Sequence, residues 1–193
     1  MKVASINDLK QELGNMPADA LVEICVRLAK FKKENKELMN YLLFESHDEQ
    51  GYIEVVKKEI SSAFTEINQS NLYFAKKSIR KILRTTGKYI KYTASKEMEI
   101  SLLLHFCNTL KASGIPFHNS AALTNLYQAQ IKKISKIIST LHEDLQYDYL
   151  KMLKNTSKHE EIRRLRAACP GVPVHAASTS GRAGMTSIMP NKG

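Results

Sequence analysis

The sequence predicts an all-α protein: an antiparallel bundle of five or six helices followed by a disordered C-terminal tail. Through residues 1–154, apolar residues recur at spacings of three and four, the period of an α-helix. No segment alternates apolar and polar residues between paired turn motifs, as the strands of a sheet would. The predicted helices are separated by short connections, which favours antiparallel packing of neighbours.

The first two predicted helices have clear starts. Ser5 with Asp8 three residues later resembles a capping box, and Gly14 ends that short helix. Pro17 then opens a long helix, because its missing N–H is tolerated in the first turn. Its apolar seam, interrupted once by Asn35, consists of Leu21, Ile24, Leu28, Phe31, Leu38 and Leu42. This heptad spacing predicts one continuous bundle helix, in which Asn35 either fixes the register against a partner helix or faces water at the end of the bundle.

Three further helices are predicted, one before and two after the segment at residues 71–93, which is considered separately below. The first of the three turns one face inward, formed by Ile53, Val56, Ile60, Phe64 and Ile67. The second begins at Ser95, whose side chain can cap it, and ends at residues 113–116. The third begins at Asn119 or Ser120 and runs to residue 154, with an irregularity near His142.

The chain divides into a helical bundle domain, residues 1–154, and a C-terminal extension. Residues 155–168 could form one more short helix, because Ser157 and Glu160 are spaced as a capping box. Residues 169–193 hold three of the five prolines and four of the eight glycines, without any aromatic residue. Such a segment buries too little apolar surface to offset its ordering entropy, so we expect a flexible or disordered tail.

The charge and the cysteines indicate a class of partner and a compartment. The net charge is +10, which favours association with nucleic acid or an acidic protein. Cys25, Cys107 and Cys169 are too widely spaced for a disulfide framework or a metal motif, and the first two lie in apolar segments where buried thiols are expected. No apolar signal opens the chain, and the run at residues 100–106 is far shorter than the roughly 20 residues of a membrane span. We therefore expect a cytoplasmic protein without a membrane span.

Positive charge concentrates on the predicted helix at residues 71–93. No acidic residue lies between Glu66 and Glu97. One face of this helix is apolar and consists of Leu72, Ala75, Ile79, Ile82, Leu83 and Ile90. The opposite half carries Lys76, Lys77, Arg80, Lys81, Arg84, Lys88 and Lys91, with Tyr73 and Tyr92 among them.

This basic stripe is the candidate binding site for an anionic partner. Each lysine or arginine that neutralises a phosphate releases a counterion, and the tyrosines could stack on unpaired bases. Two other interpretations remain open: the stripe could be an ordinary solvated face, and Gly87 could end the helix early as a C-cap.

No catalytic, metal-binding or cofactor-binding residue is predicted. His105 and Cys107 are two positions apart on a helix and therefore point in different directions. His142 and Glu143 lack the second histidine that a helical zinc-protease motif requires. The sequence contains no glycine-rich phosphate loop, nucleophile elbow or CxxC motif. We expect no enzyme, although a site assembled from scattered residues is a third alternative.

The stretches LAKFKKENKELMNYLLFE, KKSIRKILRTTGKYIKY and KEMEISLLLHFC resemble a family of uncharacterised helical proteins from Bacteroidota bacteria. The resemblance covers roughly residues 20–150 and implies a helical domain without any assigned site. We therefore expect a non-enzymatic binding or scaffold protein that contacts an anionic partner through its basic helix. The alternative is a protein–protein adaptor or a helix-mediated oligomer, in which the charge serves solubility.

Overall fold

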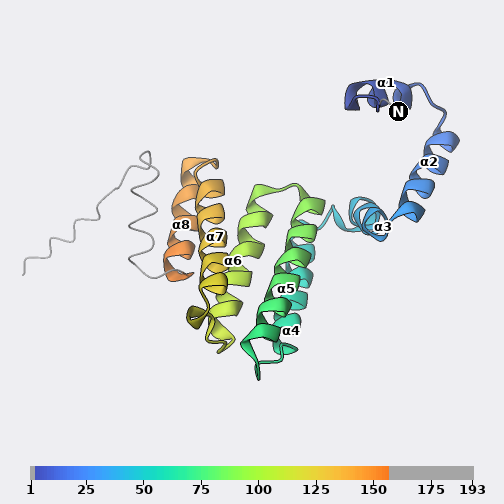
Figure 1. Ribbon diagram of the computed structural model, residues 1–193. Coiled ribbons are helices and arrows are strands. Elements are labelled where there is room, and N and C mark those ends of the chain that lie inside the picture. The colour runs from blue at the N-terminus through green and yellow to red at the C-terminus, as the bar shows by residue number, and fades with distance from the viewer. Residues whose placement is uncertain (1–2, 157–193) are drawn as a thin grey trace, which may run out of the picture.

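The computed structural model describes residues 3–156, and these residues form α-helices and no strand, which confirms the predicted fold class. Five helices build a bundle, and three more form an N-terminal arm that extends from one side of it (Figure 1). The bundle helices are α4 (Glu49–Thr65), α5 (Leu72–Thr93), α6 (Lys96–Ala112), α7 (Ala121–Ile138) and α8 (Glu143–Thr156). The arm helices are α1 (Ile6–Gly14), α2 (Ala18–Phe31) and α3 (Lys33–Asn40).

The two C-terminal predictions fall largely outside these residues. Of the short helix expected at residues 155–168, only the first two residues are described, and they belong to the end of α8. The tail expected at residues 169–193 lies wholly outside the described residues.

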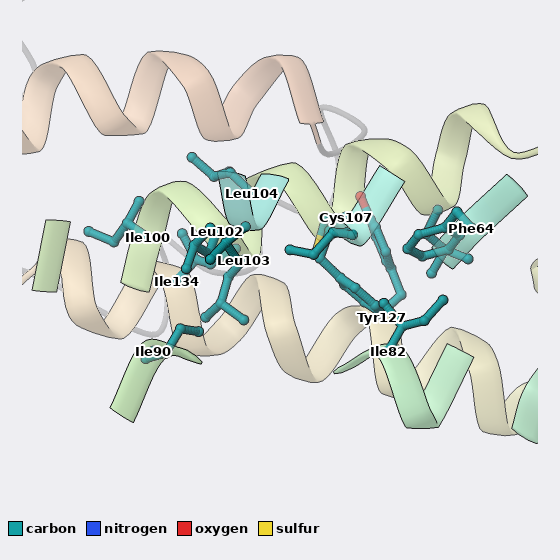
Figure 2. Packing of buried hydrophobic residues seen from close by; sticks show 14 of the residues in the cluster. Phe64, Ile82, Ile90, Ile100, Leu102, Leu103, Leu104, Cys107, Tyr127 and Ile134 are labelled. Atoms are coloured by element: carbon teal, nitrogen blue, oxygen red, sulfur yellow. The ribbon is translucent and has the colours of Figure 1, made fainter. Parts of the chain in front are cut away.

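Helix α6 is the centre of the bundle, because α4, α5, α7 and α8 all pack against it. Figure 2 shows side chains from three of these neighbours around α6, among them Phe64, Ile82 and Tyr127. The buried residues of α6 itself cover most of its circumference: Met98, Ile100, Leu102, Leu103, Leu104, Phe106, Cys107 and Leu110. A helix that is apolar nearly all round is stable only when it is surrounded, and α6 occupies that position. The predicted burial of Cys107 is confirmed.

The prediction of one long helix from Pro17 to Leu42 is wrong, because the helix is interrupted at Lys32. That residue has an extended backbone (φ −142°, ψ 146°), which separates α2 from α3. Asn35 stabilises the break, since its side-chain amide donates a hydrogen bond of 2.9 Å to the carbonyl of Leu28. This carbonyl lies in the last turn of α2, where the helix supplies no partner. Asn35 therefore neither sets a register in the bundle nor faces water at its end.

The part of the heptad seam that lies on α2 does not reach the core, whereas Leu38 on α3 packs against it. No residue of α2 is buried, and Leu28 and Phe31 are 53% and 75% exposed. Cys25, which we expected to be buried, is exposed. The reason is that α4, α5, α7 and α8 already surround α6, which leaves no place in the bundle for α2.

The arm joins the bundle through a π-helical turn, η1 (Tyr41–Glu45), and through Glu37. Tyr41 is buried, with its ring 4.7 Å from that of Tyr52 on α4. The single helix expected from Ser120 to residue 154 is likewise divided, because residues 139–142 separate α7 from α8. The irregularity predicted near His142 is thus a full break, which allows α8 to fold back onto α6 and α7.

His105 links α6 to α4 and gives the bundle a predicted pH dependence. Its Nε2 lies 2.9 Å from Ser61 Oγ and 3.1 Å from the carbonyl oxygen of Lys57. Burial lowers the pKa of His105 below its ordinary value of 6.5, although the bond to Lys57 partly opposes this. A histidine with a lowered folded-state pKa binds fewer protons folded than unfolded, so stability falls as the pH drops from 6.5 towards that lower pKa.

We expect urea unfolding of the wild type to show this loss of stability between about pH 7 and about pH 5, and His105→Gln to show a smaller one. The comparison removes the contribution of all other titrating groups, since both proteins share them. An equal loss in the two proteins would show that His105 does not carry the effect.

Candidate anion-binding face

Helix α5 is continuous over its whole predicted length. The Asn71 side chain caps its start by accepting a hydrogen bond of 2.8 Å from the N–H of Tyr73, and Ala94 ends it in a left-handed conformation (φ 51°). Gly87 lies inside the helix and does not act as a C-cap. Burial of Thr86 and Ile90 on either side offsets the roughly 1 kcal/mol that a glycine costs within a helix. The helix predicted at residues 71–93 is therefore confirmed, and the alternative in which Gly87 ends it early is excluded.

The apolar side of α5 faces the core, as its period predicts. Its buried residues are Ala75, Ile79, Ile82, Thr86, Ile90 and Tyr92. On the other side, the exposed cations are Lys77, Arg80, Lys81, Arg84 and Lys91, and Lys76 is half-buried. From Lys76 to Lys91 these side chains extend along about 22 Å of the helix axis at 1.5 Å per residue. We call the five exposed cations the α5 basic face.

Besides the half-buried Lys76, two predicted members of the site, Tyr92 and Lys88, do not belong to this face. Tyr92 is buried, and its hydroxyl donates a hydrogen bond of 2.9 Å to Glu37 Oε2. Lys88 Nζ lies 2.5 Å from the same oxygen and is half-buried. Its hydrogen bond is the main reason why the pKa of Glu37 is lowered. Stacking of Tyr92 on a ligand is therefore a wrong prediction, because α3 brings Glu37 over this part of α5.

Within residues 3–156, no cation of the α5 basic face forms an ion pair with a carboxylate. In this part of the chain, the ion pair of Lys88 with Glu37 is the only one that α5 makes. Lys57 and Lys133, by contrast, pair with Glu54 and Glu99 elsewhere in the bundle. The charge of the α5 basic face is therefore neutralised by solvent and ions, which a polyanion can displace.

An exposed aromatic pair lies at the N-terminal end of α5. Tyr73 is 68% exposed, and its ring stands edge-on to that of Phe74, which is 51% exposed, with the centroids 5.6 Å apart. The exposure predicted for Tyr73 is confirmed. Phe74 was not among the predicted site residues, although its position off the apolar period of Leu72, Ala75 and Ile79 indicates an exposed ring.

At its C-terminal end, α5 borders a groove of about 800 Å³ that it shares with α3, α6 and α7. Charged residues lining this groove are Arg84, Lys88, Lys91, Lys96, Lys133, Glu34 and Glu99. Five cations thus face two carboxylates, so the groove extends the positive surface from α5 onto α6. Sequence spacing could not identify Lys96 and Lys133 as neighbours of Arg84, because they belong to different helices.

No protein-family model, curated protein or solved structure matches this chain. Within residues 3–156, histidine, cysteine, aspartate and glutamate side chains form no group of three that could hold a metal ion. None of the described helices combines the length and the apolar character that crossing a bilayer requires. The α5 basic face, the aromatic pair and the groove are therefore the features from which a function can be inferred.

Proposed function

We propose that this protein is a non-enzymatic binding protein that holds an anionic partner, single-stranded nucleic acid, on helix α5. The observation that carries the proposal is the α5 basic face, five exposed cations on one continuous helix without a carboxylate partner in the described residues. Arg80 and Arg84 suit phosphate in particular, because a guanidinium can donate two parallel hydrogen bonds to it.

The aromatic pair favours a single strand over a duplex or an acidic protein. Tyr73 and Phe74 expose their rings at one end of the α5 basic face, where an unpaired base could stack on them. The bases of a duplex are already stacked on one another, and an acidic protein has no comparable flat rings to offer. Such binding would be largely independent of sequence, since phosphates and base faces are common to all strands. We place this activity in the cytoplasm, where the exposed thiol of Cys25 would stay reduced.

A salt titration tests the proposal. Fluorescence anisotropy with labelled single-stranded DNA and RNA should show binding at low salt that weakens as salt is added. If all five cations contact phosphates, log affinity should fall against log salt with a slope of about −3.5. A duplex of the same sequence should bind more weakly, because it cannot use the aromatic pair. Absence of binding to any nucleic acid at low salt would overturn the proposal.

A second candidate is a protein–protein adaptor. The observation in its favour is the arm, whose apolar residues are largely exposed. The two candidates use different surfaces and do not exclude one another. The salt titration separates them, because contacts to an apolar face change little with salt.

A further inference from the structure

Helix α5 contains a glycine that the fold does not require. Gly87 lies inside this 22-residue helix, where glycine is less favourable than alanine because it loses more backbone freedom on folding. Within residues 3–156, Gly114 is the only glycine with a positive φ, so the backbone at Gly87 suits any residue. Apart from its chain neighbours and the backbone of its own helix, no atom lies within 4 Å of a Cβ added at Gly87. Neither packing nor backbone conformation in the described chain therefore explains this glycine.

Gly87 forms part of the wall of the groove at the C-terminal end of α5. Arg84, Lys88 and Lys91 line this groove together with Gly87, and spacings of three and four place all of them on one side of the helix. Three of these residues carry long cationic side chains, whereas Gly87 exposes the helix backbone between them. A glycine at such a position allows another molecule to approach the main chain closely. The wall therefore combines positive charge with room for a close approach.

Two of the five cations in the groove are already paired. Lys88 binds Glu37, and Lys133 Nζ lies 2.6 Å from Glu99 Oε1. The groove cations that are exposed and form no ion pair within the described residues are Arg84, Lys91 and Lys96. Glu34 is the other carboxylate in the lining, so three cations and one carboxylate remain. The groove thus keeps an excess of positive charge that an anionic ligand can neutralise.

The groove continues the α5 basic face and has room for part of a strand. Arg84 and Lys91 belong to both surfaces. Along the helix axis these two residues are about 10 Å apart. The groove has a volume of about 800 Å³. Pockets of about 300–1,000 Å³ bury ligands of drug size, so the groove can hold about one or two nucleotides. A single strand on α5 therefore reaches the groove without leaving the positive surface.

We propose that the single strand bound on the α5 basic face continues into this groove and passes closely over Gly87. This inference rests on the function proposed above and adds a second contact site for the same strand. Arg84 and Lys91 flank Gly87 by three and four residues, so each can bind a phosphate on its own side of the closest approach. The missing side chain at Gly87 leaves room for the sugar between these phosphates. Lys96 extends the contact onto α6.

Substitution of Gly87 tests the close approach. Gly87→Ala and Gly87→Leu should both raise the urea midpoint of unfolding, because alanine and leucine favour a helix more than glycine does. Both should weaken binding of single-stranded DNA and RNA in anisotropy titrations. For Gly87→Leu we expect a loss of at least about tenfold, because a close contact does not accommodate added methyl groups. A purely structural role for Gly87 predicts the opposite change in stability.

Gly14→Leu is the matched control for this substitution. Gly14 is the last residue of α1 on the arm, and a Cβ added there likewise meets no atom within 4 Å beyond its own helix. We expect this variant to bind nucleic acid as tightly as the wild type.

Charge reversal at Lys96 tests the contact on α6. Lys96→Glu should weaken binding by about tenfold or more, because a charge-assisted hydrogen bond to phosphate is lost. The salt dependence of log affinity should flatten by about 0.7. Lys151→Glu makes the same change of net charge on α8, which lies on the other side of the bundle from α5 (Figure 1). Lys151 is also exposed, and we expect at most a small loss of affinity when it is reversed.

These measurements distinguish failure of the groove contact from failure of the proposed function. A wild type that binds single strands, with Gly87→Leu and Lys96→Glu variants that bind as tightly as their controls, would overturn the groove contact and leave the α5 basic face in place. A Gly87→Ala variant that is less stable than the wild type would also overturn it, because the fold itself would then require the glycine. Absence of binding by the wild type at low salt would overturn the proposed function and this inference with it.

Discussion

Reversing two charges in the middle of the α5 basic face, Arg80→Glu with Arg84→Glu, is expected to nearly abolish binding of single-stranded nucleic acid. Both side chains are exposed and have no partner in the described chain. Each charge-assisted hydrogen bond to phosphate contributes about 1.5–3 kcal/mol, so removing two of them lowers affinity by on the order of a hundredfold or more. The salt dependence of log affinity should flatten by about 0.7 for each phosphate that the protein no longer neutralises. Anisotropy titrations at several salt concentrations measure both effects.

A matched reversal on the arm controls for net charge. Lys32→Glu with Lys33→Glu changes the charge of the chain by the same amount, but these lysines lie close to acidic residues, and Lys33 Nζ is 3.8 Å from Glu37. We expect at most a small loss of affinity in this variant. Equal losses in the two variants would mean that binding depends on overall charge and not on α5. Circular dichroism should show unchanged helicity in both, since none of the four residues is buried.

Replacing Phe106 with alanine is expected to destabilise the bundle by about 3–5 kcal/mol, the usual cost of such a cavity in a core. Phe106 is fully buried at the centre of α6, and its ring lies 5.5 Å from that of Phe64 on α4. Natural domains unfold with about 5–15 kcal/mol in total, so this loss would remove a large share of the stability. Urea denaturation followed by circular dichroism measures the change in the free energy of unfolding.

Val55→Ala on α4 is the control for this core substitution. Val55 is 56% exposed, so its truncation should change the free energy of unfolding by no more than about 0.5 kcal/mol. A Phe106→Ala variant that is as stable as this control would contradict the central position of α6.

The sequence predicted helix boundaries best where apolar period and capping agree. The capping box of Ser5 and Asp8 is present, with hydrogen bonds of 3.0 and 3.2 Å. Helix α5 spans the predicted segment within a residue, because its apolar face and its basic face both follow the helical period. The break at Lys32 could not be predicted from spacing, since two short helices and one long helix leave the same pattern of three and four.

The amino-acid sequence by itself determined the helical class, the core face of α5 and the exposed cations opposite that face. These depend on local spacing, because residues three and four apart share one side of a helix. Tertiary structure alone decided that Lys88 and Tyr92 bind Glu37, that Lys96 and Lys133 line the groove, and that α2 stays outside the bundle. Such features depend on how far the chain turns between helices and on which helices fill the space around α6. The apolar period of a single helix specifies neither the direction that the chain takes between helices nor the set of helices that surrounds α6.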